Sequence, residues 1–128
     1  MIGLLDTQAF MWADSDPSKL SADAVAFLQT PGNQYLVSVA SLWEIVIKVH
    51  SGKLTLRAPL PNVVADQRSA NRIRVLRVTL QHVLELQNLP PVHKDPFDRM
   101  LVAQAIAEGA VLISSDPIFA QYPVQVIW

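Results

Sequence analysis

The 128-residue chain contains no cysteine, and no apolar run approaches the ~20 residues that a helix needs to cross a bilayer. The absence of cysteine excludes disulfide bonds and thiolate metal sites, and it fits a protein of the reducing cytosol. The N-terminus has no basic segment followed by an apolar stretch, so we see no signal peptide. We therefore expect a cytoplasmic protein that does not enter a membrane.

Several common catalytic signatures are also missing. The sequence has no glycine-rich phosphate loop, no nucleophile elbow and no HExxH motif. His50, His82 and His93 do not have the spacing of metal ligands, and we interpret them as ordinary residues. Because there is no internal repeat, low-complexity stretch or linker, we expect residues 1–128 to form a single domain.

What the sequence does contain is a high share of apolar residues for a protein of this size. The apolar fraction is 51% and the mean hydropathy is +0.27. Such a content is hard to bury in one small core, so we expect part of it to form a surface for a partner. The residues that we consider for this surface are Phe10, Met11, Trp12, Phe27, Leu28 and Trp43.

Short apolar segments alternate with segments of helical pattern along the chain. The predicted strands are residues 1–5, 35–38, 73–78, 111–114 and 124–128. The predicted helices are residues 7–12, 21–28, 39–50, 62–70, 80–86 and 96–108, with a helical turn at 117–122. Strands that alternate with helices imply βαβ units, so the predicted fold class is α/β with a parallel sheet.

Four acidic residues lie where such a fold builds an active site. Asp6 and Asp116 each follow an apolar strand, Glu44 lies in the helix after the second strand, and Asp98 lies at the start of the clearest helix. Ligands of an open parallel sheet bind beyond the carboxyl ends of its strands. Carboxylates gathered there repel one another unless they share a cation, and an all-oxygen site suits Mg²⁺ or Mn²⁺. The four acids therefore predict a metal site.

Each acid also has an explanation that involves no metal. The aspartates precede or begin helical segments, where such side chains cap helices, and Asp95 with Asp98 approaches a capping box. Glu44 can form a capping box with Ser41 or pair with Lys48 one turn later. Caps alone do not explain four acids with apolar neighbours at one end of a sheet, because a carboxylate in such surroundings costs free energy.

The charge is divided unevenly along the chain. Residues 45–84 contain seven basic residues and one acidic residue, a net charge of +6, whereas the rest of the chain carries −7. A basic flank beside an acidic centre suits a polyanionic substrate, although two solvated helix faces give the same pattern. The residues that we expect to hold the substrate are Lys48, Arg68, Arg72, Arg74 and Arg77.

A series of short motifs spans the chain. The stretches are Leu4-Leu-Asp-Thr7 with Phe10-Met-Trp12, Ser41-Leu-Trp-Glu-Ile-Val-Ile-Lys48 with Gly52-Lys-Leu54, Leu89-Pro-Pro-Val-His93 running into Asp95-Pro-Phe-Asp-Arg99 and Ala103-Gln-Ala105, and Ser114-Ser-Asp116. In this order they resemble the PIN-domain ribonucleases, particularly the VapC-like toxins of prokaryotic toxin–antitoxin pairs. Each stretch alone is a weak indication of the family, but the whole set in this order is specific for it.

The resemblance implies a three-layer α/β/α PIN-like fold with a central parallel sheet, and Mg²⁺- or Mn²⁺-dependent cleavage of RNA by an endoribonuclease. Carried over by position, the catalytic and metal residues are Asp6, Glu44, Asp98 and Asp116. Thr7 and Ser114 match the hydroxyls that accompany these acids in the family, and Asp95 matches a recurrent supporting acid. Arg99 and Lys48 are also expected to support the site, either by contacting phosphate or by balancing the acids. The chain departs from the pattern at Gln8, where close relatives often show histidine, and this leaves the substrate preference open.

The resemblance also implies partners. A toxin of this kind binds RNA, forms a homodimer, and is blocked by an antitoxin that lays an apolar segment in a groove and extends a basic side chain to the acids. Two other classes of function remain at this stage. One is a non-catalytic PIN-like domain that binds RNA or protein. The other is a phospho-acceptor signalling domain, which lacks a paired acid beside Asp6 and a well-placed late lysine.

Overall fold

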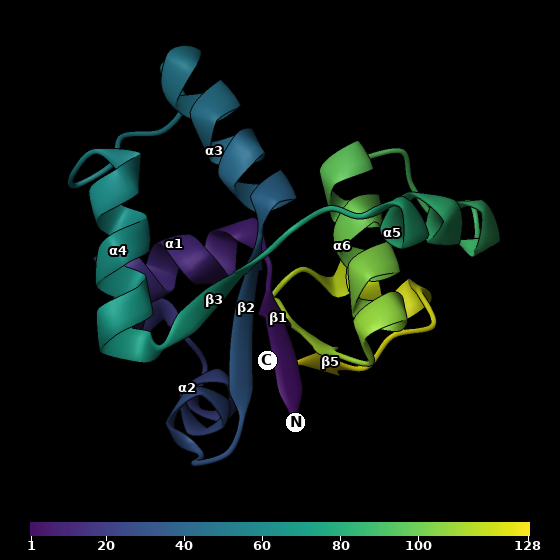
Figure 1. The fold of residues 1–128 in the computed structure, drawn as a ribbon, viewed down its shortest axis with the longest axis horizontal. Coiled ribbons are helices and arrows are strands. Elements are labelled where there is room, and N and C mark those ends of the chain that lie inside the picture. Colours follow the sequence, from purple (N-terminus) through teal and green to yellow (C-terminus); the bar gives the residue numbers. More distant parts are fainter.

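A five-stranded sheet covered on both faces by helices forms the centre of the computed structural model, which describes all residues 1–128 (Figure 1). The strands are β1 (Ile2–Leu5), β2 (Gln34–Ser38), β3 (Ile73–Leu76), β4 (Val111–Ile113) and β5 (Val126–Ile127). They lie in the order β3-β2-β1-β4-β5 and every neighbouring pair is parallel. The predicted α/β class with a parallel sheet is confirmed.

The helices form two layers, one on each side of the sheet. The α-helices are α1 (Thr7–Ser15), α2 (Ala22–Gln29), α3 (Val39–His50), α4 (Leu60–Asn71), α5 (Leu80–Glu85) and α6 (Pro96–Glu108). The short 3₁₀ helices are η1 (Pro17–Lys19), η2 (Leu86–Asn88) and η3 (Pro117–Gln121). In Figure 1, α1, α2 and α4 lie on one side of the sheet, α5 and α6 lie on the other, and α3 extends above its upper end. None of these helices is both long and apolar enough to span a membrane.

Two apolar cores match the two helical layers. One joins Phe10 of α1, Phe27 of α2 and Val63 of α4 to the sheet. The other joins Leu101 of α6 and Phe119 of η3 to the opposite face. A sheet that is buried on both faces requires apolar residues at successive strand positions, which is why its strands read as continuous apolar segments. The arrangement is the expected three-layer α/β/α fold.

Most predicted elements agree with the structure, and the differences have local causes. The strand predicted over 73–78 ends at Leu76, because its partner Ser38 is the last residue of β2. The last strand shortens to Val126–Ile127, which are the residues that pair with β4. Helix α4 begins two residues earlier than predicted, at Leu60. Pro61 then lies in the first turn of the helix, where no backbone N–H is needed.

The expected capping box between Ser41 and Glu44 is wrong. Helix α3 begins earlier, and Ser38 is its N-cap, with the Ser38 hydroxyl accepting a hydrogen bond from the Ala40 N–H at 3.0 Å. Ser41 is fully buried within the first turn, and its hydroxyl has no hydrogen-bond partner. Glu44 therefore lies in the body of the helix and is free of any capping role.

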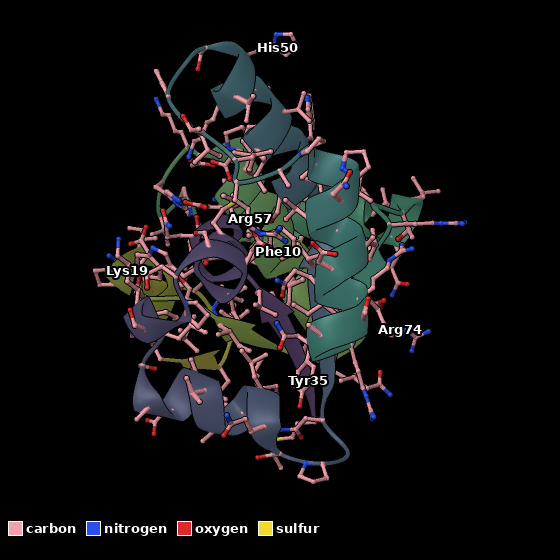
Figure 2. All side chains as sticks on the ribbon, turned by 90° about the vertical axis from the view of Figure 1, so that its left-hand side faces the viewer. Phe10, Lys19, Tyr35, His50, Arg57 and Arg74 are labelled. Carbon is pink, nitrogen blue, oxygen red and sulfur yellow. The ribbon has the colours of Figure 1, made fainter.

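The expectation about apolar surface is wrong for the residues of α1 and α2. Phe10, Met11 and Phe27 are buried in the first core, and Trp12 and Leu28 are partly buried. These side chains face the sheet because α1 and α2 pack directly on it; Figure 2 shows Phe10 inside the molecule. Trp43 behaves as expected, with 62% of its surface exposed on α3.

The order of the strands in the sheet reverses at β1. From β1 the chain passes to β2 and β3 on one side, and it later returns to β4 and β5 on the other. In open sheets of this kind, ligands bind at the carboxyl ends of the two strands where the order reverses. Here those strands are β1 and β4, which are paired directly through Leu5 and Ile113. This crevice is where Asp6 and Asp116 follow their strands.

Candidate active site

The four predicted acids line one cavity at the carboxyl end of the sheet. The cavity has a volume of about 530 Å³, and Asp6, Glu44, Asp98 and Asp116 all contribute to its wall. They come from four separate elements: the ends of β1 and β4, the middle of α3 and the first turn of α6. Thr7, Gln8, Lys48, Asp95 and Ser115 complete its polar lining. The structure therefore brings together residues that are up to 110 positions apart in the sequence.

Asp6 is the most enclosed of the four. It is 7% exposed, and it bridges α1 and β4, since one carboxylate oxygen accepts the Ala9 N–H at 2.7 Å and the other accepts the Ser114 hydroxyl at 2.5 Å. Burial raises the pKa of Asp6, the two hydrogen bonds lower it, and the charges of Asp116 and Glu44 raise it again. A cation close to Asp6 would therefore stabilise its ionised form.

Ser114 links the ends of β1 and β4. While its hydroxyl donates to Asp6, its oxygen accepts the Asp116 N–H at 3.0 Å. Asp116 in turn caps η3, with Oδ1 accepting the Ile118 N–H at 3.0 Å. The buried serine thus holds both aspartates at the crevice, which agrees with the supporting role that the resemblance gives it.

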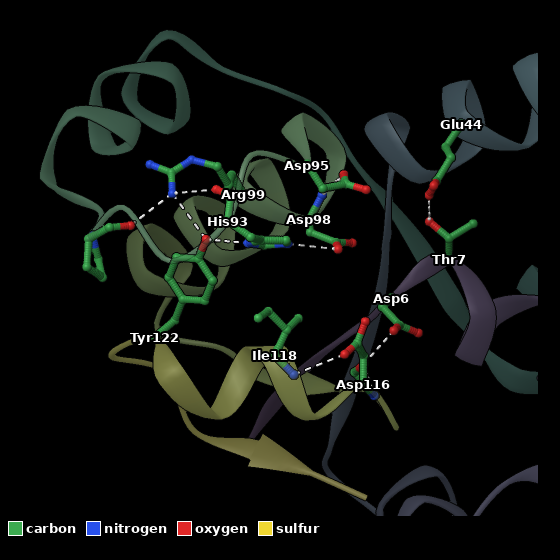
Figure 3. A network of polar contacts seen from close by, with 12 residues as sticks. Asp6, Thr7, Glu44, His93, Asp95, Asp98, Arg99, Asp116, Ile118 and Tyr122 are labelled. Carbon is green, nitrogen blue, oxygen red and sulfur yellow. Dashed lines mark hydrogen bonds and ion pairs between the residues drawn. The ribbon is translucent and has the colours of Figure 1, made fainter.

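Glu44 is held from two directions. Its Oε1 accepts the Thr7 hydroxyl at 2.5 Å, and its Oε2 pairs with Lys48 at 3.2 Å one turn along α3. The alternative pairing of Glu44 with Lys48 is thus present in the structure. Thr7 follows Asp6 directly, so this hydrogen bond connects the end of β1 with α3 (Figure 3). Lys48 is the only basic side chain that lines the cavity.

Asp98 faces the cavity from the first turn of α6. Its backbone N–H donates to Asp95 Oδ1 at 2.9 Å, and its Oδ2 is 3.1 Å from Nε2 of His93. Burial raises the pKa of Asp98 to about 6; the hydrogen bond from His93 opposes this shift, and the charges of Asp95 and Glu44 add to it. Asp95 acts as the N-cap of α6, as the alternative interpretation predicted.

Helix capping and a metal site are compatible here. Asp6, Asp95 and Asp116 each use one oxygen as a cap, and the second oxygen of Asp95 and of Asp116 has no protein partner. Because a carboxylate has about four acceptor positions, a cap leaves most of its capacity available. The caps also fix each carboxylate in one orientation at the cavity wall.

As they stand, no three histidine, aspartate or glutamate side chains form a group that could hold a metal ion. The residues nevertheless fit a hard divalent cation by their chemistry. The donor set consists of carboxylate and hydroxyl oxygens, and burial, with smaller contributions from neighbouring acids, raises the pKa values of Asp6 and Asp98. A divalent cation held by these residues would stabilise their ionised forms.

The predicted basic residues do not all lie beside the acids. Arg68, Arg72 and Arg74 line a separate cavity of about 450 Å³ at the start of β3. They lie at the amino end of the edge strand, whereas the acids lie at the carboxyl ends, and Figure 2 shows Arg74 projecting outwards beside the lower end of α4. Arg77 is exposed just past the end of β3, and only Lys48 reaches the acidic cavity.

Two residues of the site were missed by sequence reasoning. His93, which we interpreted as ordinary, contacts Asp98, and Tyr122 contacts His93 at 2.6 Å between its hydroxyl and Nδ1. Arg99 donates to the same hydroxyl at 3.1 Å. The signal that could have identified His93 is its position in the turn that leads into α6, five residues before Asp98. No comparable signal marks Tyr122, which is 29 residues away from His93.

From the raised pKa of Asp98 we predict that the stability of the fold in metal-free buffer depends on pH. A carboxyl group whose folded pKa is raised from 3.8 to about 6 stabilises the fold fully below pH 3.8, and this contribution is lost as pH rises through 6. An asparagine side chain cannot ionise, so the stability of Asp98→Asn relative to wild type should rise between these pH values by on the order of 2 kcal/mol. Urea unfolding of both proteins at several pH values measures this difference.

The control is Asp23→Asn, because Asp23 is exposed on α2 away from the cavity. Its stability relative to wild type should change little across the same range. A difference between Asp98→Asn and wild type that stays constant with pH would contradict the raised pKa.

Comparison with known proteins supports the fold and identifies the family. The chain resembles three solved structures: VapBC2 from Rickettsia felis bound to a DNA fragment from their promoter, DNA-bound VapBC from Salmonella typhimurium, and VapBC-1 from nontypeable Haemophilus influenzae. The TM-scores are 0.73, 0.69 and 0.66, the identities are 17%, 17% and 20%, and the matches cover 98% of this chain and 97%, 96% and 96% of the others. At these identities the likeness establishes the fold.

A search of curated proteins found no match. The protein-family model of the PIN domain, by contrast, matches residues 3–125, which include all five acids of the cavity and both core layers. Since this match covers nearly the whole chain, the protein belongs to the PIN domain family.

Proposed function

We propose that residues 1–128 form a single PIN domain that acts in the cytoplasm as a metal-dependent endoribonuclease, and as the toxin of a toxin–antitoxin pair. The observation that carries the proposal is the convergence of Asp6, Glu44, Asp98 and Asp116 on one cavity at the sheet crevice. PIN domains generally use divalent metal ions, and the all-oxygen lining suits Mg²⁺ or Mn²⁺.

The four acids would hold the metal, which supplies polarisation of the phosphodiester and a lowered pKa for a water molecule. Ser114 and the Ala9 N–H keep Asp6 in place, and Thr7 orients Glu44. Lys48 balances the charge of Glu44 and is the lining residue best suited to a phosphate oxygen. No protein nucleophile is needed, because water attacks the phosphorus atom.

A second candidate is a non-catalytic PIN-like domain that binds RNA or protein. The observation in its favour is that three of the five carboxylates at the cavity cap helices, while Glu44 already has two protein partners. Its acids would then be structural. Cleavage of RNA by the pure protein separates the two candidates.

The purified protein should cleave single-stranded RNA in Mg²⁺ or Mn²⁺ and lose this activity in excess chelator. Asp6→Asn and Asp98→Asn should each reduce the cleavage rate at least about 100-fold, since each removes a ligand charge while it keeps the volume. Wild-type protein produced in a host without its antitoxin should arrest growth, whereas neither variant should do so. Time courses of RNA cleavage and growth curves measure these effects.

Asp23→Asn serves as the matched control and should keep full activity, because Asp23 is exposed on α2. Activity that persists in chelator, or full activity of Asp6→Asn, would reject the metal-dependent nuclease. Harmless expression of a folded and nuclease-competent protein would reject the toxin role alone.

We propose that the arginines at the start of β3 hold the RNA backbone at a distance from the acids. Arg68, Arg72 and Arg74 line one cavity together, and no acidic residue contributes to its lining. Arg57 has a different role, because its Nε and Nη2 donate three hydrogen bonds to Asp14 and its Nη2 also donates to Asp66, which ties α1 to α4. The free arginines are therefore the ones available to phosphate.

Arg68→Gln combined with Arg74→Gln should weaken the binding of single-stranded RNA in chelator, where no cleavage occurs. Each lost phosphate contact should flatten the log–log salt dependence of binding by roughly 0.7. Arg72 is left intact, since its φ of 54° forms the C-cap of α4 and a change there risks the fold. Fluorescence titration at several salt concentrations measures both effects.

Lys19→Gln is the control, because Lys19 lies on η1 and pairs only weakly with Asp16 at 3.9 Å. It should leave the salt dependence unaltered. If the double variant binds RNA with wild-type affinity and slope, the arginines form only a solvated face.

An apolar groove beside the acids supports the proposed antitoxin. It has a volume of about 690 Å³ and lies between α3, the following loop and the start of α4, with Val46, Val49, Leu56 and Leu60 among its lining residues. Leu54 lines both this groove and the acidic cavity. An apolar antitoxin segment in the groove would therefore bring a neighbouring basic side chain to the acids.

A different apolar surface supports the proposed homodimer. Val39, Trp43 and Ile47 form a stripe on the outer side of α3, and Leu80 and Leu84 are exposed on α5. Ser38 pairs with Leu76 at the end of the sheet, and the chain continues from these residues into α3 and, after a short segment, into α5. Exposed apolar surface of this extent usually marks an interface.

The protein should be a dimer at tens of micromolar, and Trp43→Arg with Leu84→Glu should make it monomeric, because buried unpaired charges oppose association. Sedimentation velocity measures the change. Ala26→Glu, an exposed position on α2, should leave the dimer intact. A wild-type monomer at this concentration would refute the homodimer.

A further inference from the structure

A chain of hydrogen bonds leads from Arg99 to Asp98 (Figure 3). Arg99 Nη1 donates to the Tyr122 hydroxyl at 3.1 Å, this hydroxyl is 2.6 Å from His93 Nδ1, and His93 Nε2 is 3.1 Å from Asp98 Oδ2. The two roles expected for Arg99 were contact with phosphate and balance of the acids, and neither His93 nor Tyr122 was expected at the site. Arg99 does not line the acidic cavity, and these contacts connect it to Asp98 through Tyr122 and His93.

The order of donors along this chain follows from Arg99. A guanidinium only donates, so the Tyr122 oxygen must accept from Arg99. Arg99 and Nδ1 of His93 are the only protein partners of the Tyr122 hydroxyl, so donation of its proton to Nδ1 leaves no donor of this group unpaired. In this arrangement the proton of the neutral imidazole lies on Nε2 and is donated to Asp98. The contacts favour this tautomer.

The network is held in place by the buried Tyr122 and by the several partners of Arg99. Tyr122 is 4% exposed, and its ring packs edge-on against His93 with a centroid distance of 5.5 Å. Arg99 is also fixed by the carbonyl oxygens of Pro90 at 2.9 Å and His93 at 3.3 Å. Arg99 thus holds both the backbone of the turn before α6 and the hydroxyl that orients the imidazole.

We propose that His93 is the positioning residue of Asp98, held as the Nε2–H tautomer by Tyr122 and Arg99. Its Nε2–H fixes Asp98 Oδ2 and leaves Oδ1 without a protein partner. Figure 3 shows the Asp98 carboxylate projecting from α6 into the space that it shares with Asp6 and Glu44. The effect on metal binding rests on the proposed function, whereas the tautomer does not.

The proposal has an energetic consequence for the cavity. A carboxylate that is free to rotate must lose this freedom when it binds a cation, and a hydrogen bond made beforehand removes that cost. Hydrogen-bond partners behind metal ligands typically contribute 10- to 100-fold in metal affinity. We therefore expect loss of the His93 donor to weaken metal binding about 10-fold.

The tautomer is tested by nitrogen NMR of the imidazole, without metal or RNA. At neutral pH the His93 signals, identified by their loss in His93→Gln, should show a protonated Nε2 and an Nδ1 that accepts a hydrogen bond. Tyr122→Phe should shift the Nδ1 signal, because its donor is removed. Tyr35→Phe is the matched control, since the Tyr35 hydroxyl bonds to the distant Thr30 carbonyl, and it should shift neither signal. A proton on Nδ1, or an Nδ1 signal unchanged in Tyr122→Phe, overturns the proposal.

The positioning role is tested by calorimetric titration with Mn²⁺ alone. His93→Leu should bind Mn²⁺ about 10-fold more weakly than wild type. His93→Gln should recover most of this loss, because its amide nitrogen can donate to Asp98. Equal affinities of His93→Leu and wild type, or equal losses in both variants, overturn the positioning role. An absence of RNA cleavage together with the expected tautomer and Mn²⁺ affinities would instead reject the proposed nuclease function.

Discussion

The crowding of carboxylates at the crevice between β1 and β4 is the constraint on which the rest of the site depends. Asp6 is buried there; burial raises its pKa most, and the charges of Asp116 and Glu44 add to the shift. Like charges in partly desolvated surroundings raise one another's pKa values, and the arrangement is stable only if hydrogen-bond donors or a cation offset the repulsion. The protein supplies donors around the wall and leaves the centre of the cavity without one.

The donors come from parts of the fold that also define its geometry. Backbone N–H groups at the starts of α1, α6 and η3 each bind one carboxylate, so the same contact caps a helix and orients an acid. Ser114 and Thr7 extend this support between strands and helices. Asp98 contacts His93, which in turn contacts the Tyr122 hydroxyl. The capping and metal interpretations of the acids therefore describe two uses of the same side chains.

The surfaces around the cavity are divided by chemistry. The free arginines lie at the amino end of the edge strand, and the apolar groove lies at the C-terminal half of α3 and the loop that follows it. Val39, Trp43, Val46, Ile47 and Val49 of α3 are exposed, and Val46 and Val49 also line the groove. At the cavity wall, Lys48 contributes the basic side chain, and Leu54 is shared with the groove.

The sequence alone determined the elements and the local placement of the acids. Apolar periodicity, caps and the residues that follow each strand are local properties, so most helices and strands, and the position of Asp6 and Asp116 at strand ends, could be predicted. Contacts between distant residues decided the rest: the strand order, the burial of Phe10, the engagement of Arg57 by Asp14, and the contact of Tyr122 with His93. No pattern of neighbouring residues in the sequence indicates such contacts, because they arise only when the packing of the two helical layers brings the segments together.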